Sequence, residues 1–350
     1  MSIEPDRPWG SNFTPEEIAE TRARKGLLSM ELELSRECNL RCVYCYASSG
    51  KALHNELTRE EIASALDQAI ALGARRIIVI GGGEPLLYPG VMDIMRGLRE
   101  RGIAVDLFTN GTLITPEIAR ELFTMGVSPV VKLNSMREEV QDALAAVPGT
   151  YRAIQEGLKN LMAAGYPSAN LPLGVETIIC RQNIDELPSM WIWARERNIV
   201  PYFEMITFQG RAKRQLDLNV SSEELRRVFF ELSRIDREQF GFVWEPHPPI
   251  AALSCNRHEY SCTLNAQGYI QPCVGVDMFI GNIRHAPLAE ILATAPVMET
   301  MRGLRDHIKG ACRSCDQSQE CYGCRGLAYH VTGDFLEADP LCWLNPKRII

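Results

Sequence analysis

Short apolar runs alternate with amphipathic helical stretches between residues 27 and 215 of the chain. The apolar runs are typical of buried strands and lie at 27–35, 75–83, 103–111, 128–135, 171–180 and 201–208. Helical patterns fill the gaps, over 58–73, 89–101, 115–125, 138–164 and 184–197. Thr58 and Glu61 form a predicted capping box at the start of the first helix. The alternation predicts an α/β fold built as a partial (β/α)6 TIM-like barrel.

The pattern changes after residue 215. One amphipathic helix over 221–236 precedes the Pro-rich stretch WEPHPPIAAL, which indicates a domain boundary. Beyond it the chain is rich in cysteine and poor in periodicity, so we expect little continuous core and a dependence on metal for stability. The predicted parts are an N-terminal extension over 1–27, the barrel over 28–215, a connection over 216–250, and a small cysteine-rich cluster-binding domain over 251–350.

Composition and charge place the chain among ordinary globular proteins. Hydrophobic residues make up 46% and charged residues 23%, and the formal net charge is −7 with no marked basic run. The polar, acidic N-terminus is unlike a signal peptide, and no apolar stretch reaches the roughly 18 residues of a membrane span. We therefore predict a cytoplasmic protein without nucleic-acid or membrane partners. The outlier is the count of 12 cysteines, which in a reducing compartment indicates metal or cluster ligation.

Three of these cysteines form a loop directly after the first predicted strand. Cys38, Cys42 and Cys45 have the spacing C-x3-C-x2-C, with no fourth ligand nearby. The carboxyl ends of barrel strands are where barrel enzymes build their sites. Thiolates in this arrangement suit a [4Fe–4S] cluster with one open iron. A structural zinc site is the alternative, although such sites favour paired C-x2-C knuckles.

The segment CNLRCVYC resembles the signature of the radical S-adenosylmethionine (SAM) superfamily. The resemblance implies that SAM itself chelates the open iron and that Tyr44 packs near its adenine. A second match is the turn GGGEP, whose glycines allow close backbone approach and whose oxygens accept bonds from an ammonium group. Alone, this stretch would be an ordinary tight turn. The resemblance assigns to the SAM amino group the residues Gly82, Gly83, Glu84 and Pro85.

Further polar residues are expected inside the barrel. Strand alternation places Lys132 and Asn134 on one face of the fourth strand, and Glu176 with Cys180 on one face of the fifth. Polar groups inside a barrel need partners, and the ribose hydroxyls of SAM would serve. Thr109 resembles the family's third-strand turn, whereas Lys132 departs from the small polar residue that is usual there. The expected cofactor-binding set therefore adds Thr109, Lys132, Asn134 and Glu176, with internal hydrogen bonding as the alternative.

The remaining cysteines resemble the SPASM extension of radical SAM enzymes. The pattern is Cys255-x12-Gly268-x4-Cys273, then Cys312-x2-Cys315-x5-Cys321-x2-Cys324, and later Cys342. The family more often has three residues between the last two cysteines of the middle group. The resemblance implies two auxiliary [4Fe–4S] clusters, held by Cys255, Cys262, Cys273 and Cys324, and by Cys312, Cys315, Cys321 and Cys342. Structural zinc knuckles are the alternative.

One cysteine, Cys180, is left over from these three sets. In radical SAM epimerases a thiol returns a hydrogen atom to the substrate radical, so Cys180 is a candidate catalytic hydrogen donor. The alternative is a buried cysteine that packs as a small hydrophobic residue.

The resemblances cover about residues 28 to 345 and predict an enzyme that cleaves SAM reductively and abstracts hydrogen from an unactivated carbon. The outcome would be oxidation, cross-linking or epimerisation. Too few residues precede the first strand for a peptide-recognition domain, which favours a polyol or aminosugar, or a short peptide. Val274 replaces the aspartate of sulfatase-maturing members and disfavours that activity. The expected electron donor is a flavodoxin- or ferredoxin-type protein. The alternative is a multi-cluster electron-transfer protein without SAM chemistry.

Overall fold

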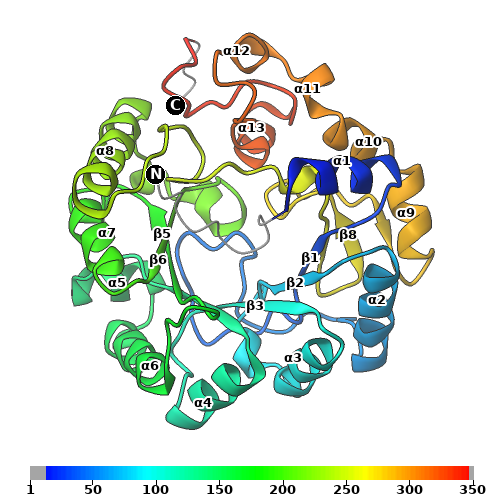
Figure 1. Cartoon of the computed structure of the whole chain (residues 1–350), viewed down its shortest axis with the longest axis horizontal. Coiled ribbons are helices and arrows are strands. Elements are labelled where there is room, and N and C mark those ends of the chain that lie inside the picture. The colour runs from blue at the N-terminus through cyan, green and yellow to red at the C-terminus, as the bar shows by residue number, and fades with distance from the viewer. Residues whose placement is uncertain (1–12, 347–350) are drawn as a thin grey trace.

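Six parallel strands and the helices between them form a partial barrel in the computed structural model, which describes residues 13–346 (Figure 1). The strands are β1 (Ser29–Leu32), β2 (Arg76–Val79), β3 (Ala104–Thr109), β4 (Ser128–Lys132), β5 (Gly174–Ile179) and β6 (Val200–Met205). They pair in chain order. The helices of this part are α2 (Arg59–Ala71), α3 (Val91–Glu100), α4 (Pro116–Met125), α5 (Glu138–Ala145), α6 (Thr150–Ala164), α7 (Leu187–Arg195) and α8 (Ser222–Ile235). The predicted fold class is confirmed.

Local sequence explains most of these elements. The Thr58–Glu61 capping box at the start of α2 is confirmed. Ile77, Ile78 and Val79 of β2 are fully buried, as a strand covered on both faces requires. The N-terminal helix α1 (Pro15–Ala23) was not predicted, although Thr14 and Glu17 form a second capping box there. Residues 1–12 of the predicted N-terminal extension lie outside the described residues.

The C-terminal part of the chain continues the barrel sheet. Strand β7 (Thr263–Leu264) pairs in parallel with β1, and the antiparallel strands β8 (Tyr269–Gln271) and β9 (Gly281–Asn282) follow. The expectation of a core-poor segment was wrong, because Leu264, Ile270 and Leu288 join the same hydrophobic core as the barrel. The predicted domain boundaries stay predictions, and the sheet runs without a break across the one near residue 250.

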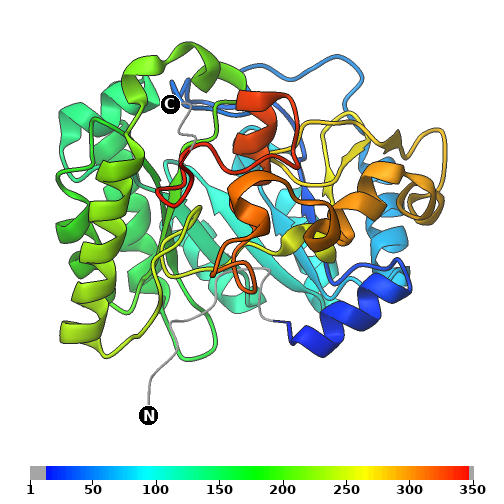
Figure 2. The ribbon, with the colours of Figure 1, turned by 90° about the horizontal axis from the view of Figure 1, so that it is seen from above.

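Short helices complete this part of the structure. They are α9 (Leu288–Thr294), α10 (Pro296–Arg302), α11 (Leu304–His307), α12 (Gly310–Arg313) and α13 (Arg325–Thr332). Figure 2 shows α13, in red, near the upper middle of the molecule and α1, in dark blue, at its lower right. Among the helices of residues 13–346, none has the length and apolar character needed to cross a membrane.

Candidate active site

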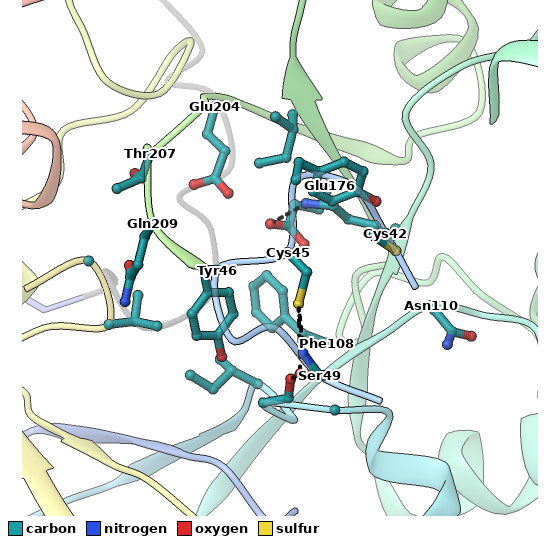
Figure 3. A pocket seen from close by; sticks show the side chains of 18 of the residues that line it. Cys42, Cys45, Tyr46, Ser49, Phe108, Asn110, Glu176, Glu204, Thr207 and Gln209 are labelled. Atoms are coloured by element: carbon teal, nitrogen blue, oxygen red, sulfur yellow. Dashed lines mark hydrogen bonds and ion pairs between the residues drawn. The ribbon is translucent and has the colours of Figure 1, made fainter. Parts of the chain in front are cut away.

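A cavity of about 250 Å³ lies where the parallel strands end. Its wall combines residues of the cysteine loop, the GGGEP turn, the ends of β3 to β6, the segment after β6, and Val274 with Gly275. Figure 3 shows Cys42, Cys45 and Tyr46 facing the same space as Glu176, Glu204 and Thr207. The structure therefore brings the two sequence motifs and the polar barrel residues into one site.

The cysteine loop is fixed by close backbone contacts on two sides. On one side, Gly83 N donates to Ser35 O and Glu84 N donates to Glu37 O, both at 2.8 Å. A Cβ on Gly83 would lie 1.9 Å from Glu37 O, so only glycine permits this approach. On the other side, Arg211 N donates to Cys45 O at 3.0 Å, and a Cβ on Gly210 would lie 2.1 Å from Tyr46 O. Two glycines far apart in sequence thus hold the loop.

Cys38, Cys42 and Cys45 all line the cavity. Burial, followed by the charges of Cys45 and Cys38, raises the pKa of Cys42 to about 11. Burial also raises the pKa of Cys38, with smaller contributions from Glu84 and Cys45. Thiols that oppose each other's ionisation in this way need a cationic group to become thiolates, which is what the irons of a cluster provide. The donor set therefore fits the predicted SAM-binding cluster.

The GGGEP turn borders the cavity through Gly82, Gly83 and Glu84. Glu84 accepts hydrogen bonds from Thr109 Oγ1 and Asn110 N, both at 2.7 Å, which tie the turn to the end of β3. Burial raises the pKa of its carboxyl group. Thr109 also lines the cavity. Pro85 is buried and begins a short 3-10 helix, and it does not line the cavity.

Tyr44 and Lys132 lie together in the cavity wall. The Lys132 ammonium is 5.4 Å from the centre of the Tyr44 ring, within reach of a cation–π interaction. Asn134 was predicted to bind the cofactor. The structure places it outside the cavity wall, because it is fully buried and does not line the cavity. Its Nδ2 donates to Tyr44 Oη at 2.6 Å, and its Oδ1 accepts from Ile178 N at 2.9 Å. Asn134 thus positions Tyr44 and joins it to the backbone of β5.

An acidic pair lies beside Lys132. Glu176 forms an ion pair with Lys132 at 2.8 Å and is hydrogen bonded to Glu204 of β6. Burial raises the pKa of Glu204 well above its usual value, and the charge of Glu176 raises it as well. Burial alone would raise the pKa of Glu176, but the Lys132 charge and the bond from Glu204 hold it below its usual value. Glu204 is therefore the protonated member and Glu176 the charged one.

Sequence reasoning missed Glu204, Arg211 and Arg257, which all line the cavity. Arg257 donates to Glu31 Oε1 and to Tyr202 Oη, each at 2.8 Å. Arg211 Nε donates to Cys42 O at 2.7 Å. Glu204 carried a usable signal, since it is the one acidic residue in the apolar run 201–208. The arginines carried none, because they lie in irregular segments.

Cys180 does not occupy the predicted position. It is 1% exposed, belongs to the hydrophobic core, and does not line the cavity. Strand β5 ends at Ile179, and Cys180 N donates to Asn183 Oδ1 at 2.9 Å in the turn that follows. Burial raises the pKa of its thiol to about 11. The structure thus supports the packing alternative and not the hydrogen-donor role.

The C-terminal cysteines form two groups. Burial, followed by neighbouring charges that include Cys312 and Cys315, raises the pKa of Cys321 to about 12. The pKa of Cys342 is raised in the same way, by burial and then by the charges of Asp339, Cys312 and Cys321. These four thiols, the predicted second auxiliary set, are therefore near enough to act on one another electrostatically. Within residues 13–346, no three His, Cys, Asp or Glu side chains lie close enough to share a single metal ion.

The predicted first auxiliary set comes together only in part. The charges of Cys255 and Cys324 are among those that, after burial, raise the pKa of Cys273. Cys262 was predicted as the fourth ligand of this set, and the structure places it elsewhere. It is 1% exposed in the hydrophobic core, and the charges that act on its thiol are those of Arg302 and Glu31. Cys255, Cys273 and Cys324 are thus near enough to act on one another electrostatically, whereas, among the residues described, no cysteine charge acts on Cys262.

Comparison with known proteins matches both parts of the chain. Residues 32–187 match the radical SAM superfamily, and the AdoMet-dependent heme synthase of Methanosarcina barkeri is 30% identical over 90% of this chain and 96% of its own length. The chain belongs to the radical SAM superfamily. Residues 255–316 match the SPASM iron–sulfur cluster-binding domain.

Two further proteins are similar to this radical SAM enzyme. The PqqA peptide cyclase of Ruegeria pomeroyi is 27% identical over 92% of this chain and 88% of its own length. SuiB of Streptococcus suis, solved with S-adenosylmethionine, superposes with a TM-score of 0.72 at 16% identity, over 93% of this chain and 80% of SuiB. The cofactors of the chain are thus SAM and iron–sulfur clusters. The number of three clusters stays a prediction.

When bound, the cluster and SAM would supply the radical chemistry of this enzyme family. The chain's own residues would bind these groups and limit the access of water to them. Cys38, Cys42 and Cys45 would hold the cluster, and the oxygens of the GGGEP turn would receive the SAM amino group. The partly buried wall formed by Tyr44 and the Lys132–Glu176 pair would limit the access of bulk water to a bound substrate.

Two matched variants test the protonation of the acidic pair. Glu176→Gln should destabilise the protein by about 3 kcal/mol, because it leaves Lys132 without its charged partner in a mostly buried site. Glu204→Gln should cost less than about 1 kcal/mol, because a glutamine amide can donate to Glu176 as the protonated carboxyl does. Urea unfolding under anaerobic conditions measures both. If Glu204→Gln lowers the free energy of unfolding more than Glu176→Gln does, Glu204 is the charged member of the pair and Glu176 the protonated one.

Proposed function

We propose that this radical SAM enzyme acts on an iron porphyrin, converting carboxylate-bearing side chains during heme formation. The observation that carries the proposal is the end-to-end similarity to the Methanosarcina heme synthase, which spans both the barrel and the cluster-binding part. This substrate takes the place of the polyol or aminosugar that the sequence alone favoured.

The chemistry of the substrate agrees with the predicted cofactors. Heme carries vinyl groups, and a porphyrin propionate becomes a vinyl group when it loses one hydrogen atom, carbon dioxide and one electron. Hydrogen abstraction from the unactivated propionate carbon requires a radical of the kind that SAM cleavage supplies. The electron needs an acceptor near the substrate, and Val274 and Gly275, next to Cys273, line the same cavity. A flavodoxin- or ferredoxin-type donor would supply the electron for SAM cleavage.

The cavity offers cationic groups for substrate carboxylates. Lys132, Arg211 and Arg257 line it, and each belongs to a different segment of the chain. Arginine binds carboxylates through paired N–H donors, and a buried wall strengthens such bonds. The partners Glu176 and Glu31 balance two of these charges, which keeps the empty site from carrying a large net charge.

The proposal is tested with anaerobically reconstituted enzyme, SAM, a low-potential reductant and iron coproporphyrin III. We expect 5′-deoxyadenosine to form at a rate that rises with the porphyrin, and a product that has lost CO2 and H2 for each converted side chain. Mass spectrometry measures both. The porphyrin proposal fails if 5′-deoxyadenosine forms at the same rate without the porphyrin and the porphyrin mass does not change.

A peptide is the second candidate substrate. It is favoured by the PqqA peptide cyclase, whose similarity also spans nearly the whole of this chain. The same assay with precursor peptides encoded beside this chain's gene distinguishes the two candidates. A peptide that loses hydrogen and stimulates 5′-deoxyadenosine formation would replace the porphyrin.

A further inference from the structure

We infer that the first auxiliary cluster of this chain has three cysteine ligands, Cys255, Cys273 and Cys324. We further infer that its fourth iron faces the substrate cavity and is open to an anionic oxygen or sulfur donor of the substrate. The inference rests on the cluster-binding role proposed for the C-terminal part, and it does not depend on which substrate is correct.

Cys262 is turned away from the cavity by the register of β7. Glu31 N donates to Cys262 O at 2.9 Å, so the backbone at Cys262 already runs alongside β1. The next residue, Thr263, donates through Oγ1 to Glu31 Oε2 at 2.6 Å, and Glu31 lines the cavity. Neighbouring side chains on a strand point to opposite faces. Thr263 therefore points to the side of Glu31, and Cys262 points to the core near Arg302 of α10.

The other three thiols are brought together by two loops in backbone contact. A Cβ on Gly326 would lie 2.6 Å from Gly275 O, so the loops after Cys273 and Cys324 touch at two glycines. Gly275 N donates to Cys273 Sγ and Leu327 N donates to Cys324 Sγ, both at 3.3 Å. Backbone N–H groups directed at sulfur in this way stabilise thiolates. Cys255 acts electrostatically on both thiols.

This three-cysteine group borders the substrate cavity. Val274 and Gly275 line the cavity between them, directly after Cys273. Thr207, another lining residue, has its Oγ1 3.9 Å from Cys324 Sγ. Arg257, two residues after Cys255, lines it too. An iron without a protein thiolate in this group therefore has a route to the substrate.

Two carboxylates lie near these thiols, and both are already engaged. Glu31 accepts bonds from Arg257 through Oε1 and from Thr263 through Oε2. Asp339 accepts from Cys324 N through Oδ2 at 2.7 Å and from Leu341 N through Oδ1 at 3.0 Å. Binding iron would require either carboxylate to give up a bond in a buried site, which is costly. The fourth position is thus left to the substrate.

The test uses oxidation of the auxiliary clusters in a full-length chain that lacks the first cluster through Cys38→Ala, Cys42→Ala and Cys45→Ala. An iron without a thiolate ligand is the one lost when a [4Fe–4S] cluster is oxidised, and the resulting [3Fe–4S] cluster has its own electron paramagnetic resonance signal. After treatment with ferricyanide we expect about one such spin per chain, from the first auxiliary cluster alone.

Cys262 and Cys273 provide the matched comparison. Adding Cys262→Ala, or the larger and apolar Cys262→Val, should leave the iron content and the [3Fe–4S] signal unchanged. Adding Cys273→Ala should remove about four iron atoms and the signal. The inference is overturned if no [3Fe–4S] signal forms in the starting variant, or if the signal first appears when Cys262 is replaced. No substrate is present, so failure of this test is separate from failure of the porphyrin proposal.

Discussion

Replacing Cys38, Cys42 and Cys45 together by alanine should abolish SAM cleavage and remove about a third of roughly 12 bound iron atoms. The three thiols line one cavity with the GGGEP turn, so the variant loses the SAM-binding cluster and keeps the C-terminal cysteines unchanged. Iron and sulfide analysis after anaerobic reconstitution, together with detection of 5′-deoxyadenosine, measures both effects.

Cys180→Ala is the control for this experiment. Cys180 is buried in the core and lies outside the cavity, so its replacement should keep the iron content and the SAM cleavage. Two results would contradict the assignment. One is residual 5′-deoxyadenosine from the triple variant, and the other is stoichiometric zinc with negligible sulfide in the wild-type protein.

The barrel and the cysteine loop could be predicted because their signals are local. A buried strand such as β2 is a short apolar run that ends in glycines, and the alternation of such runs with amphipathic helices specifies an α/β fold. The spacing of Cys38, Cys42 and Cys45 lies within one loop, so it needs no knowledge of distant contacts. The three cysteines therefore line a cavity at the strand ends, where the sequence predicted the site.

The predictions that failed depend on contacts between distant parts of the chain. The direction of Cys262 is set by a two-residue strand whose partner, β1, lies more than two hundred residues earlier. Cys180 lies just beyond the end of β5, where the turn closed by Asn183 breaks the alternation of the strand. Asn134 is used by Tyr44 and by the backbone of β5. Spacing along the sequence contains none of this information.

Gly83→Ala should disrupt SAM binding more than any other single substitution in the turn. The added Cβ would lie 1.9 Å from Glu37 O and 2.6 Å from Glu37 C, so the backbone of the cysteine loop must move. Overpacking of this kind costs about 1–3 kcal/mol or more. A displacement near 1 Å at a reacting centre can lower the rate by about a hundredfold. We expect a loss of at least that size in 5′-deoxyadenosine formation, with weaker SAM binding by calorimetry.

Gly97→Ala separates this steric effect from a general effect of adding a methyl group to the chain. Gly97 lies inside α3, and nothing lies within 4 Å of the position its Cβ would take. Alanine in a helix interior is favoured over glycine by about 0.5–1 kcal/mol, so this variant should be slightly more stable and fully active. If Gly83→Ala instead matches Gly97→Ala in SAM affinity and rate, contact between the turn and the backbone of Glu37 does not position the cluster loop. The hydrogen bonds from Gly83 N and Glu84 N would then be sufficient to hold it, because they do not depend on the side chain.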